Sequence, residues 1–165
     1  LVLAKKRSVL TSLHADLREG KVYKRYLALV IGRWVGGERS VTLPLRKFLT
    51  QGGERRVSVD RADGMASRTD FRVEQALPGF TLISAVLGTG RTHQIRVHLS
   101  HIGFPIAGDE KYGIFERNRE FARQGLSRMF LHATELCMTH PVSGAQLRLQ
   151  APLPLELKHF LDTLG

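Results

Sequence analysis

The sequence has little of three things that each mark a class of protein: cysteine, long apolar runs and acidic side chains. Cys137 is the only cysteine, so an intrachain disulfide is excluded. No apolar run approaches the roughly 20 residues that cross a bilayer as a helix. The opening run Leu1–Ala4 is too short for a signal-peptide core, and basic residues follow it instead of preceding it. We interpret it as the end of a buried strand, and we expect a cytoplasmic protein.

The shortage of acidic side chains gives the chain a strong positive charge. Lysine and arginine total 25 against 15 aspartates and glutamates, which leaves a formal net charge of +10. A domain this basic attracts polyanions, so nucleic acid, the ribosome and an anionic membrane are the candidate partners. No strongly amphipathic basic helix is evident, which makes a membrane the weakest of the three. A basic ribosome-associated protein with no chemistry of its own stays open at this point.

Repeats, low-complexity tracts and linkers are also missing, so the 165 residues are expected to form one domain over positions 1–165. Hydrophobic residues make up 42% of the chain, which is enough for a core and argues against disorder. The first residue is Leu1 and not an initiator methionine. We therefore expect a fragment that lacks an N-terminal part of its parent.

Residue patterning predicts an α+β fold with a largely antiparallel sheet and a few helices. Helical spacing of apolar residues predicts helices at residues 4–20, 92–102 and 154–164, with 115–124 as a surface helix or an irregular excursion. Alternation and β-branched or aromatic content predict strands at residues 22–35, 40–43, 55–60, 68–74, 80–87, 129–139 and 145–150. Residues 80–87 are apolar on both faces, which is typical of a central strand.

The stretch Gly88-Thr89-Gly90-Arg91-Thr92-His93-Gln94-Ile95-Arg96 joins that central strand to the next helix. Its glycines allow a sharp turn and a close approach to a ligand, and Thr92 is the expected N-cap. The helix start offers free N–H groups and a positive dipole end. Arg96 should lie at the edge of the core beside Ile95, where an arginine needs an acidic partner or an anionic ligand.

Three interpretations of this stretch compete on the residues alone. It is either a helix cap with a few solvated cations, a nucleotide phosphate loop, or a site that handles the phosphates and bases of a nucleic acid. The phosphate loop is weak because the required lysine and glycine spacing are absent, whereas the net charge favours nucleic acid. A metal site at His98 and His101 is also weak, because no zinc-protease glutamate and no second cysteine accompany them.

Several motifs, in order along almost the whole chain, resemble the signature of the RluA-type pseudouridine synthases. They are Lys24-Arg25-Tyr26-Leu27-Ala28, Gly90–His98, Gly103–Asp109, Tyr112-Gly113, Leu131-His132-Ala133 and His140-Pro141. The run Leu3-Ala4-Lys5-Lys6-Arg7-Ser8 is similar to members that act on the large ribosomal subunit. The resemblance covers enough sequence, in long enough motifs, to be specific.

The resemblance implies an enzyme that isomerises uridine in RNA to pseudouridine. The glycosidic bond to the base nitrogen breaks, the uracil rotates and a carbon–carbon bond forms, with the target base flipped from its stack. It implies no metal and no organic cofactor. The family's catalytic aspartate belongs to a His-Arg-Leu-Asp-type motif just before the residues that match Leu1–Ala4, and this chain lacks that motif. We therefore expect the chain alone to be inactive.

The resemblance also assigns candidate site residues. Tyr26 matches the active-site tyrosine that stacks on the flipped base and is a candidate general base. Arg96 matches the arginine that pairs with the catalytic aspartate, which accounts for an arginine at the edge of the core. Arg91, His93 and Gln94 are candidates for contacts to RNA or for ordering the site, and Asp109 and Tyr112 for fixing the loop that follows the helix.

Large-subunit (23S) ribosomal RNA is the implied partner, no membrane is expected, and the protein is expected to be a monomer. The alternative is a non-catalytic RNA-binding or ribosome-assembly module of the same shape.

Overall fold

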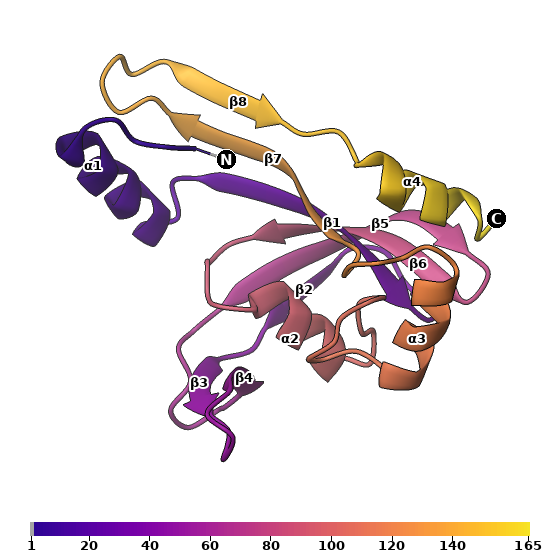
Figure 1. Ribbon diagram of the computed structural model, residues 1–165. Helices are drawn as coiled ribbons and strands as arrows, with labels where there is room; N and C mark the ends of the chain where they lie inside the picture. The colour runs from indigo at the N-terminus through magenta and orange to yellow at the C-terminus, as the bar shows by residue number, and fades with distance from the viewer. Residues whose placement is uncertain (1) are drawn as a thin grey trace.

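A computed structural model describes residues 2–165 as a six-stranded antiparallel sheet with four helices and a separate two-stranded hairpin (Figure 1). The elements follow in the order α1 (Arg7–Arg18), β1 (Tyr23–Ile31), β2 (Arg39–Thr42), β3 (Leu45–Leu49), β4 (Arg55–Val59), β5 (Arg68–Leu77), β6 (Phe80–Leu87), α2 (Gln94–His101), α3 (Phe115–Arg123), β7 (Leu131–Thr139), β8 (Gln146–Gln150) and α4 (Leu155–Asp162). The large sheet has the strand order β2-β5-β6-β1-β7-β8, and all pairs are antiparallel. The predicted α+β class is confirmed.

Strand β1 lies in the middle of this sheet and is buried on both faces. Ala28 and Val30 point into a cluster that includes Ile95 and Leu99 of α2. Leu29, between them, points into a second cluster built with aromatic residues of α3 and α4. Because successive side chains of a strand point to opposite faces, α2 covers one face of the sheet and α3 and α4 pack on the other. The even-numbered residues of β1 therefore face α2.

The β3–β4 hairpin pairs in a second sheet and projects from the large one beside α2, as Figure 1 shows. Its inner residues Leu45 and Val57 pack on Val97 of α2, and Val59 and Tyr112 add to this small cluster. The outer side chains Phe48 and Leu49 are exposed. The hairpin is thus attached to the body of the protein mainly through α2 and the loop that follows it.

Three expectations from the sequence are wrong in detail. No strand was predicted between residues 43 and 55, but β3 occupies Leu45–Leu49 and pairs with β4 across the turn at residues 51–53. Helix α2 begins at Gln94, with His93 as its N-cap in the left-handed conformation (φ 53°), so Thr92 is not the cap. Val2 and Leu3 are exposed and form no strand, while Leu1 lies outside the described residues.

Within residues 2–165 no helix is both long and apolar enough to span a membrane.

Candidate active site

Tyr26 and Arg91, two of the predicted site residues, line one cavity of about 570 Å³. Tyr26 comes from the middle of β1, where it pairs with Ala85 of β6 on one side and Ala133 of β7 on the other. Arg91 comes from the loop between β6 and α2, at residues 88–93. The sheet and the loop thus bring together residues that are far apart in the sequence. The cavity lies on the face of the sheet that α2 covers, because Tyr26 packs on the same cluster as Ile95.

The residues that the structure describes around this cavity include three cations and no acidic side chain. Arg18 at the end of α1 and Lys24 of β1 join Arg91 in its wall. None of these three residues forms an ion pair within the described part of the chain. Burial raises the pKa of the Tyr26 hydroxyl, so the tyrosine is neutral at physiological pH. The arrangement suits an aromatic ring that stacks on a base beside a phosphate backbone.

Gln94 fixes the loop that carries Arg91. The side chain is buried, and its Oε1 accepts hydrogen bonds from the Thr89 hydroxyl at 2.7 Å and the Arg91 N–H at 3.0 Å. Its Nε2 donates to the carbonyl of Arg68 at 2.8 Å and to the Thr69 hydroxyl at 2.9 Å. All four bonding positions of the amide are therefore used inside the chain. Gln94 ties the loop to β5 and has no free polar position to offer to RNA.

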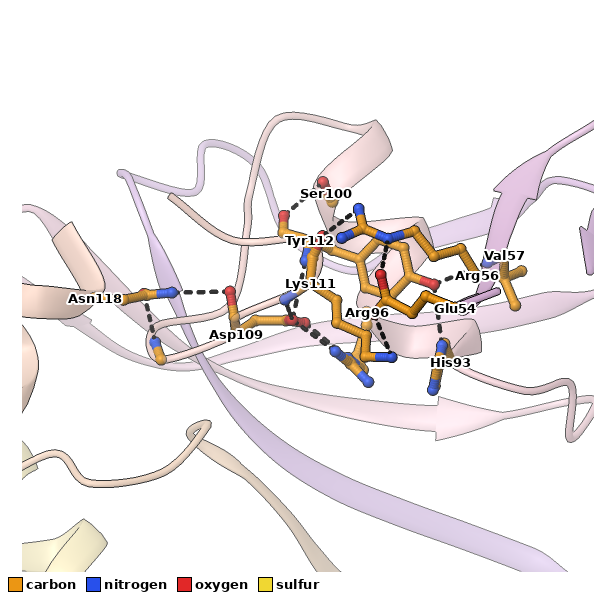
Figure 2. Close-up of polar contacts among 11 residues, drawn as sticks. Glu54, Arg56, Val57, His93, Arg96, Ser100, Asp109, Lys111, Tyr112 and Asn118 are labelled. Atoms are coloured by element: carbon orange, nitrogen blue, oxygen red, sulfur yellow. Dashed lines mark hydrogen bonds and ion pairs between the residues drawn. The ribbon is translucent and has the colours of Figure 1, made fainter. Parts of the chain in front are cut away.

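Arg96 meets the requirement for an acidic partner through Asp109, in the loop after α2 (Figure 2). Arg96 Nε and Nη2 donate to the two oxygens of Asp109 at 2.8 and 2.7 Å, which is a bidentate pair. The Asp109 carboxylate is 1% exposed and also accepts the backbone N–H groups of Lys111 and Tyr112. The guanidinium carbon lies 4.9 Å from the centre of the Tyr112 ring.

The pKa of Asp109 reflects this environment. Burial alone raises it, but the Arg96 guanidinium and the two backbone N–H groups outweigh burial and lower the pKa below its usual value. The same pair raises the pKa of Arg96. Arg96 uses its Nε and Nη2 for Asp109, and among the residues that the structure describes its Nη1 makes no hydrogen bond. Arg96 does not line the Tyr26 cavity; it lines a separate cavity beside α3.

His93 points away from the Tyr26 cavity, toward the β3–β4 hairpin. Its Nδ1 lies 3.0 Å from the Tyr112 hydroxyl, which also accepts the N–H of Val57 in β4 at 2.9 Å (Figure 2). Burial, together with the charges of Arg96 and Lys111, lowers the pKa of His93. A neutral His93 can then accept the Tyr112 proton. His93 also lines a cavity of about 470 Å³ whose other wall is the hairpin.

His98, one of the histidines considered as metal ligands, is held in the core by hydrogen bonds. His98 is fully buried, with its ring nitrogens 3.0 Å from the Thr69 hydroxyl and 2.9 Å from the Ser67 hydroxyl. No group of three or more potential ligands occurs within residues 2–165. His98 therefore serves the core as a hydrogen-bonded polar residue.

Lys24 belongs to the Lys24–Ala28 motif, and the sequence alone assigned it no role. The structure places it beside Tyr26 and Arg91, 9% exposed. Its position two residues before Tyr26 in a strand was the available signal, because residues i and i+2 share a face. What the sequence could not show is that the face is buried at this point.

Comparison with known proteins assigns the chain to a family. Residues 1–101 match the family model described as RNA pseudouridylate synthase, and the chain belongs to that family. It is 46% identical over 164 residues to the ribosomal large subunit pseudouridine synthase C of Yersinia pestis and 48% identical over 170 residues to that of Escherichia coli K12. Each alignment covers 99% of this chain but 51% and 52% of the relative. The chain therefore spans about half the length of the curated relatives that it matches.

Solved structures show the same fold. Human RNA pseudouridylate synthase domain containing 1 matches with a TM-score of 0.74 and 29% identity, over 92% of this chain and 62% of that chain. Human RNA pseudouridylate synthase domain containing 4 matches with a TM-score of 0.76, over 98% of this chain and 69% of that chain. Its 24% identity supports the fold alone. The family predicted from the motifs is confirmed.

Proposed function

We propose that this chain supplies Tyr26, Arg91 and Arg96 to an enzyme that isomerises uridine to pseudouridine in large-subunit ribosomal RNA. The observation that carries the proposal is the cavity in which Tyr26 stands among unpaired cations, in a chain of the pseudouridylate synthase family. The relatives at 46% and 48% identity are both named for the large ribosomal subunit, which supports that RNA as the substrate. The site of action would be the cytoplasm, where ribosomal RNA is modified.

The reaction is an isomerisation and needs no net gain or loss of atoms. The bond from the ribose C1′ to the base N1 breaks, the uracil rotates, and C1′ bonds to the ring carbon C5; C5 then loses its proton and the freed N1 gains one, so the product is an isomer of the substrate. Tyr26 would stack on the flipped base and hold it during rotation. Because burial raises the pKa of the Tyr26 hydroxyl, the hydroxyl stays protonated and stacking on the base is its main role. To remove the proton of the ring carbon as a general base, Tyr26 would first have to give its own proton to another group.

The resemblance matches Arg96 to the arginine that pairs with the family's catalytic aspartate. Because Asp109 already holds its Nε and Nη2, and because Arg96 lines a different cavity from Tyr26, that aspartate would have to reach Arg96 through Nη1 from outside the Tyr26 cavity. This second pairing would keep the aspartate ionised and oriented. Arg91 would contact the RNA backbone, and Gln94 and His93 would order the loop and the hairpin beside it. None of the chain's own aspartates lies in the family's catalytic motif, and Asp109 is occupied by Arg96.

The test is to map pseudouridines in large-subunit ribosomal RNA with and without the gene, and then to assay the 165-residue chain and the complete gene product on the unmodified RNA. We expect specific sites to vanish without the gene and to be restored by the complete product but not by this chain alone. Unchanged maps would refute the ribosomal substrate. RNA binding without isomerisation by the complete product would favour a non-catalytic RNA-binding module. Pseudouridine formation by the chain alone would refute the need for the missing motif.

A further inference from the structure

Lys24 is a buried lysine whose amine has no anionic partner in the described part of the chain. The residue is 9% exposed and takes part in no ion pair there. Burial lowers the pKa of the amine, and no neighbouring carboxylate opposes that shift. An unpaired buried charge is costly, so proteins keep one mainly where a ligand of opposite charge binds.

The surroundings of Lys24 are built for an anion. Within residues 2–165, the cavity that Lys24 lines contains two more cations, Arg18 and Arg91, and no carboxylate. A side chain at Gly90 would place its Cβ 3.3 Å from the Lys24 Nζ, so glycine leaves the amine room beside the loop. Glu135 borders a neighbouring cavity that Lys24 also lines, but its carboxylate is bonded to Arg148.

We propose that Lys24, together with Arg91, binds the phosphate of the nucleotide whose base stacks on Tyr26. The proposal rests on the proposed function, because it assigns a phosphate-binding role within the same site. A phosphodiester fits better than a single carboxylate: several cations converge there, two of them exposed arginines that can approach phosphate oxygens in pairs. Lys24 would then hold the RNA phosphate in place while the base leaves its stack and rotates in the site.

Stability without RNA gives the first test. Lys24→Met keeps the length of the side chain and removes the charge, and Lys24→Arg keeps the charge. If the amine is unpaired, the methionine variant of the 165-residue chain should unfold at a higher urea concentration than the wild type. The arginine variant should show no such gain. A fall in the midpoint for Lys24→Met would mean that the amine already has a stabilising partner, which would overturn the proposal.

RNA binding by the same chain gives the second test. The probe is an RNA hairpin with uridines in its loop, titrated at several salt concentrations. Loss of one phosphate contact lowers the slope of log affinity against log salt by about 1, and we expect this for Lys24→Met. The matched control is Lys158→Met on the exposed side of α4, which removes the same charge far from the cavity. Equal slopes for the two methionine variants would refute a specific contact at Lys24.

A modified probe distinguishes phosphate from other anions. A neutral methylphosphonate placed 5′ to the target uridine should lower the affinity of the wild type and leave that of Lys24→Met almost unchanged. If the lysine instead pairs with the family's aspartate, Lys24→Met would slow the complete gene product without altering RNA affinity, and the phosphate assignment would be wrong. If the slope changes as expected but the complete product forms no pseudouridine, the phosphate site stands and the proposed function fails.

Discussion

Arg96 and Asp109 form the most buried ion pair of the described chain, with side-chain exposures of 14% and 1%. Charges at such a position are stable only when each has its partner and its remaining hydrogen-bonding positions are filled. Asp109 accepts from Arg96 and from two backbone N–H groups, so it joins α2 to the loop at residues 106–113. Its main contribution is therefore to hold the guanidinium in one orientation.

Asp109→Asn should destabilise the chain, because the amide leaves the Arg96 charge uncompensated. The expected loss in the free energy of unfolding is about 3 to 5 kcal/mol, measured by urea denaturation. Glu120→Gln is the matched control, since Glu120 makes an exposed pair with Arg117 on α3. That control should change stability by no more than about 0.5 kcal/mol. Similar small effects for both variants would show that Arg96 finds another partner.

The contribution of Asp109 should also depend on pH. Its pKa is lowered in the folded state, so its stabilising effect is complete above the unfolded value of about 3.9 and is lost as the pH falls through the folded pKa. The difference in unfolding free energy between wild type and Asp109→Asn should therefore shrink as the pH drops below about 4. A difference that stays constant down to pH 3 would contradict this linkage.

For single residues, the sequence indicated which side chains need a partner, but not which residues surround them in the fold. The position of Arg96 at the edge of the core followed from helical spacing, and so did its need for an anion. That Asp109 provides it depends on how the next loop folds back, which spacing alone does not determine. The cap at His93 was missed because a left-handed histidine is uncommon and Thr92 has the usual capping chemistry.

Among the elements, the β3–β4 hairpin is linked to the N-cap of α2 through the hydroxyl of Tyr112. The Tyr112 hydroxyl contacts Val57 of the hairpin and His93 at the helix start. Lys111 adds an ion pair to Glu54 at the end of the hairpin turn. Residues of the hairpin and His93 also line one cavity of about 470 Å³, so the position of the hairpin and that of the helix start are coupled.

Tyr112→Phe should loosen the hairpin while leaving the main sheet intact. The change removes two hydrogen bonds but keeps the ring that lies against Arg96, so we expect a loss of about 1 to 2 kcal/mol. Amide hydrogen exchange should speed up at Val57 and its neighbours in β3 and β4. Exchange in β1 and β6 is the internal control and should not change. Equal acceleration in both sheets would indicate global unfolding instead.

A buried face alone does not decide which elements could be predicted, because helix α1 and strand β8 were predicted although neither has a buried residue. The apolar run of β6 was predicted with its observed bounds, Phe80–Leu87. Strand β3 was missed because only Leu45 is buried, and its apolar residues Leu45, Phe48 and Leu49 do not alternate with polar ones. Its conformation follows from pairing with β4, which is a contact between segments and leaves little pattern in either one.

For the whole molecule, the charge of +10 and the cations around Tyr26 make a prediction about affinity. RNA binding by the chain should weaken as salt rises, with log affinity falling by about 0.9 per phosphate contact for each unit of log salt on duplex and about 0.7 on single strands. Filter binding or fluorescence anisotropy over a salt series measures the slope. A slope near zero would show that the net charge does not act in binding.

The family and the fold class could be predicted from the sequence, because the motifs are long and occur in order. The cavity could not be predicted, because its walls come from α1, β1 and loop 88–93, which only the three-dimensional fold brings together. Nor could the sequence show that Tyr26 and Arg96 open onto different cavities.

Strand β1 separates two kinds of surface by simple alternation. Lys24 and Tyr26 lie on the face of α2, while Arg25 between them lies on the opposite face, paired with Glu74 at 2.6 Å. Inserting or deleting one residue within β1 between Lys24 and Tyr26 would move one of them to the opposite face of the sheet, away from the cavity. Evolution should therefore tolerate changes of chain length in this family at turns such as residues 51–53 and 141–144, and should select strongly against them inside β1.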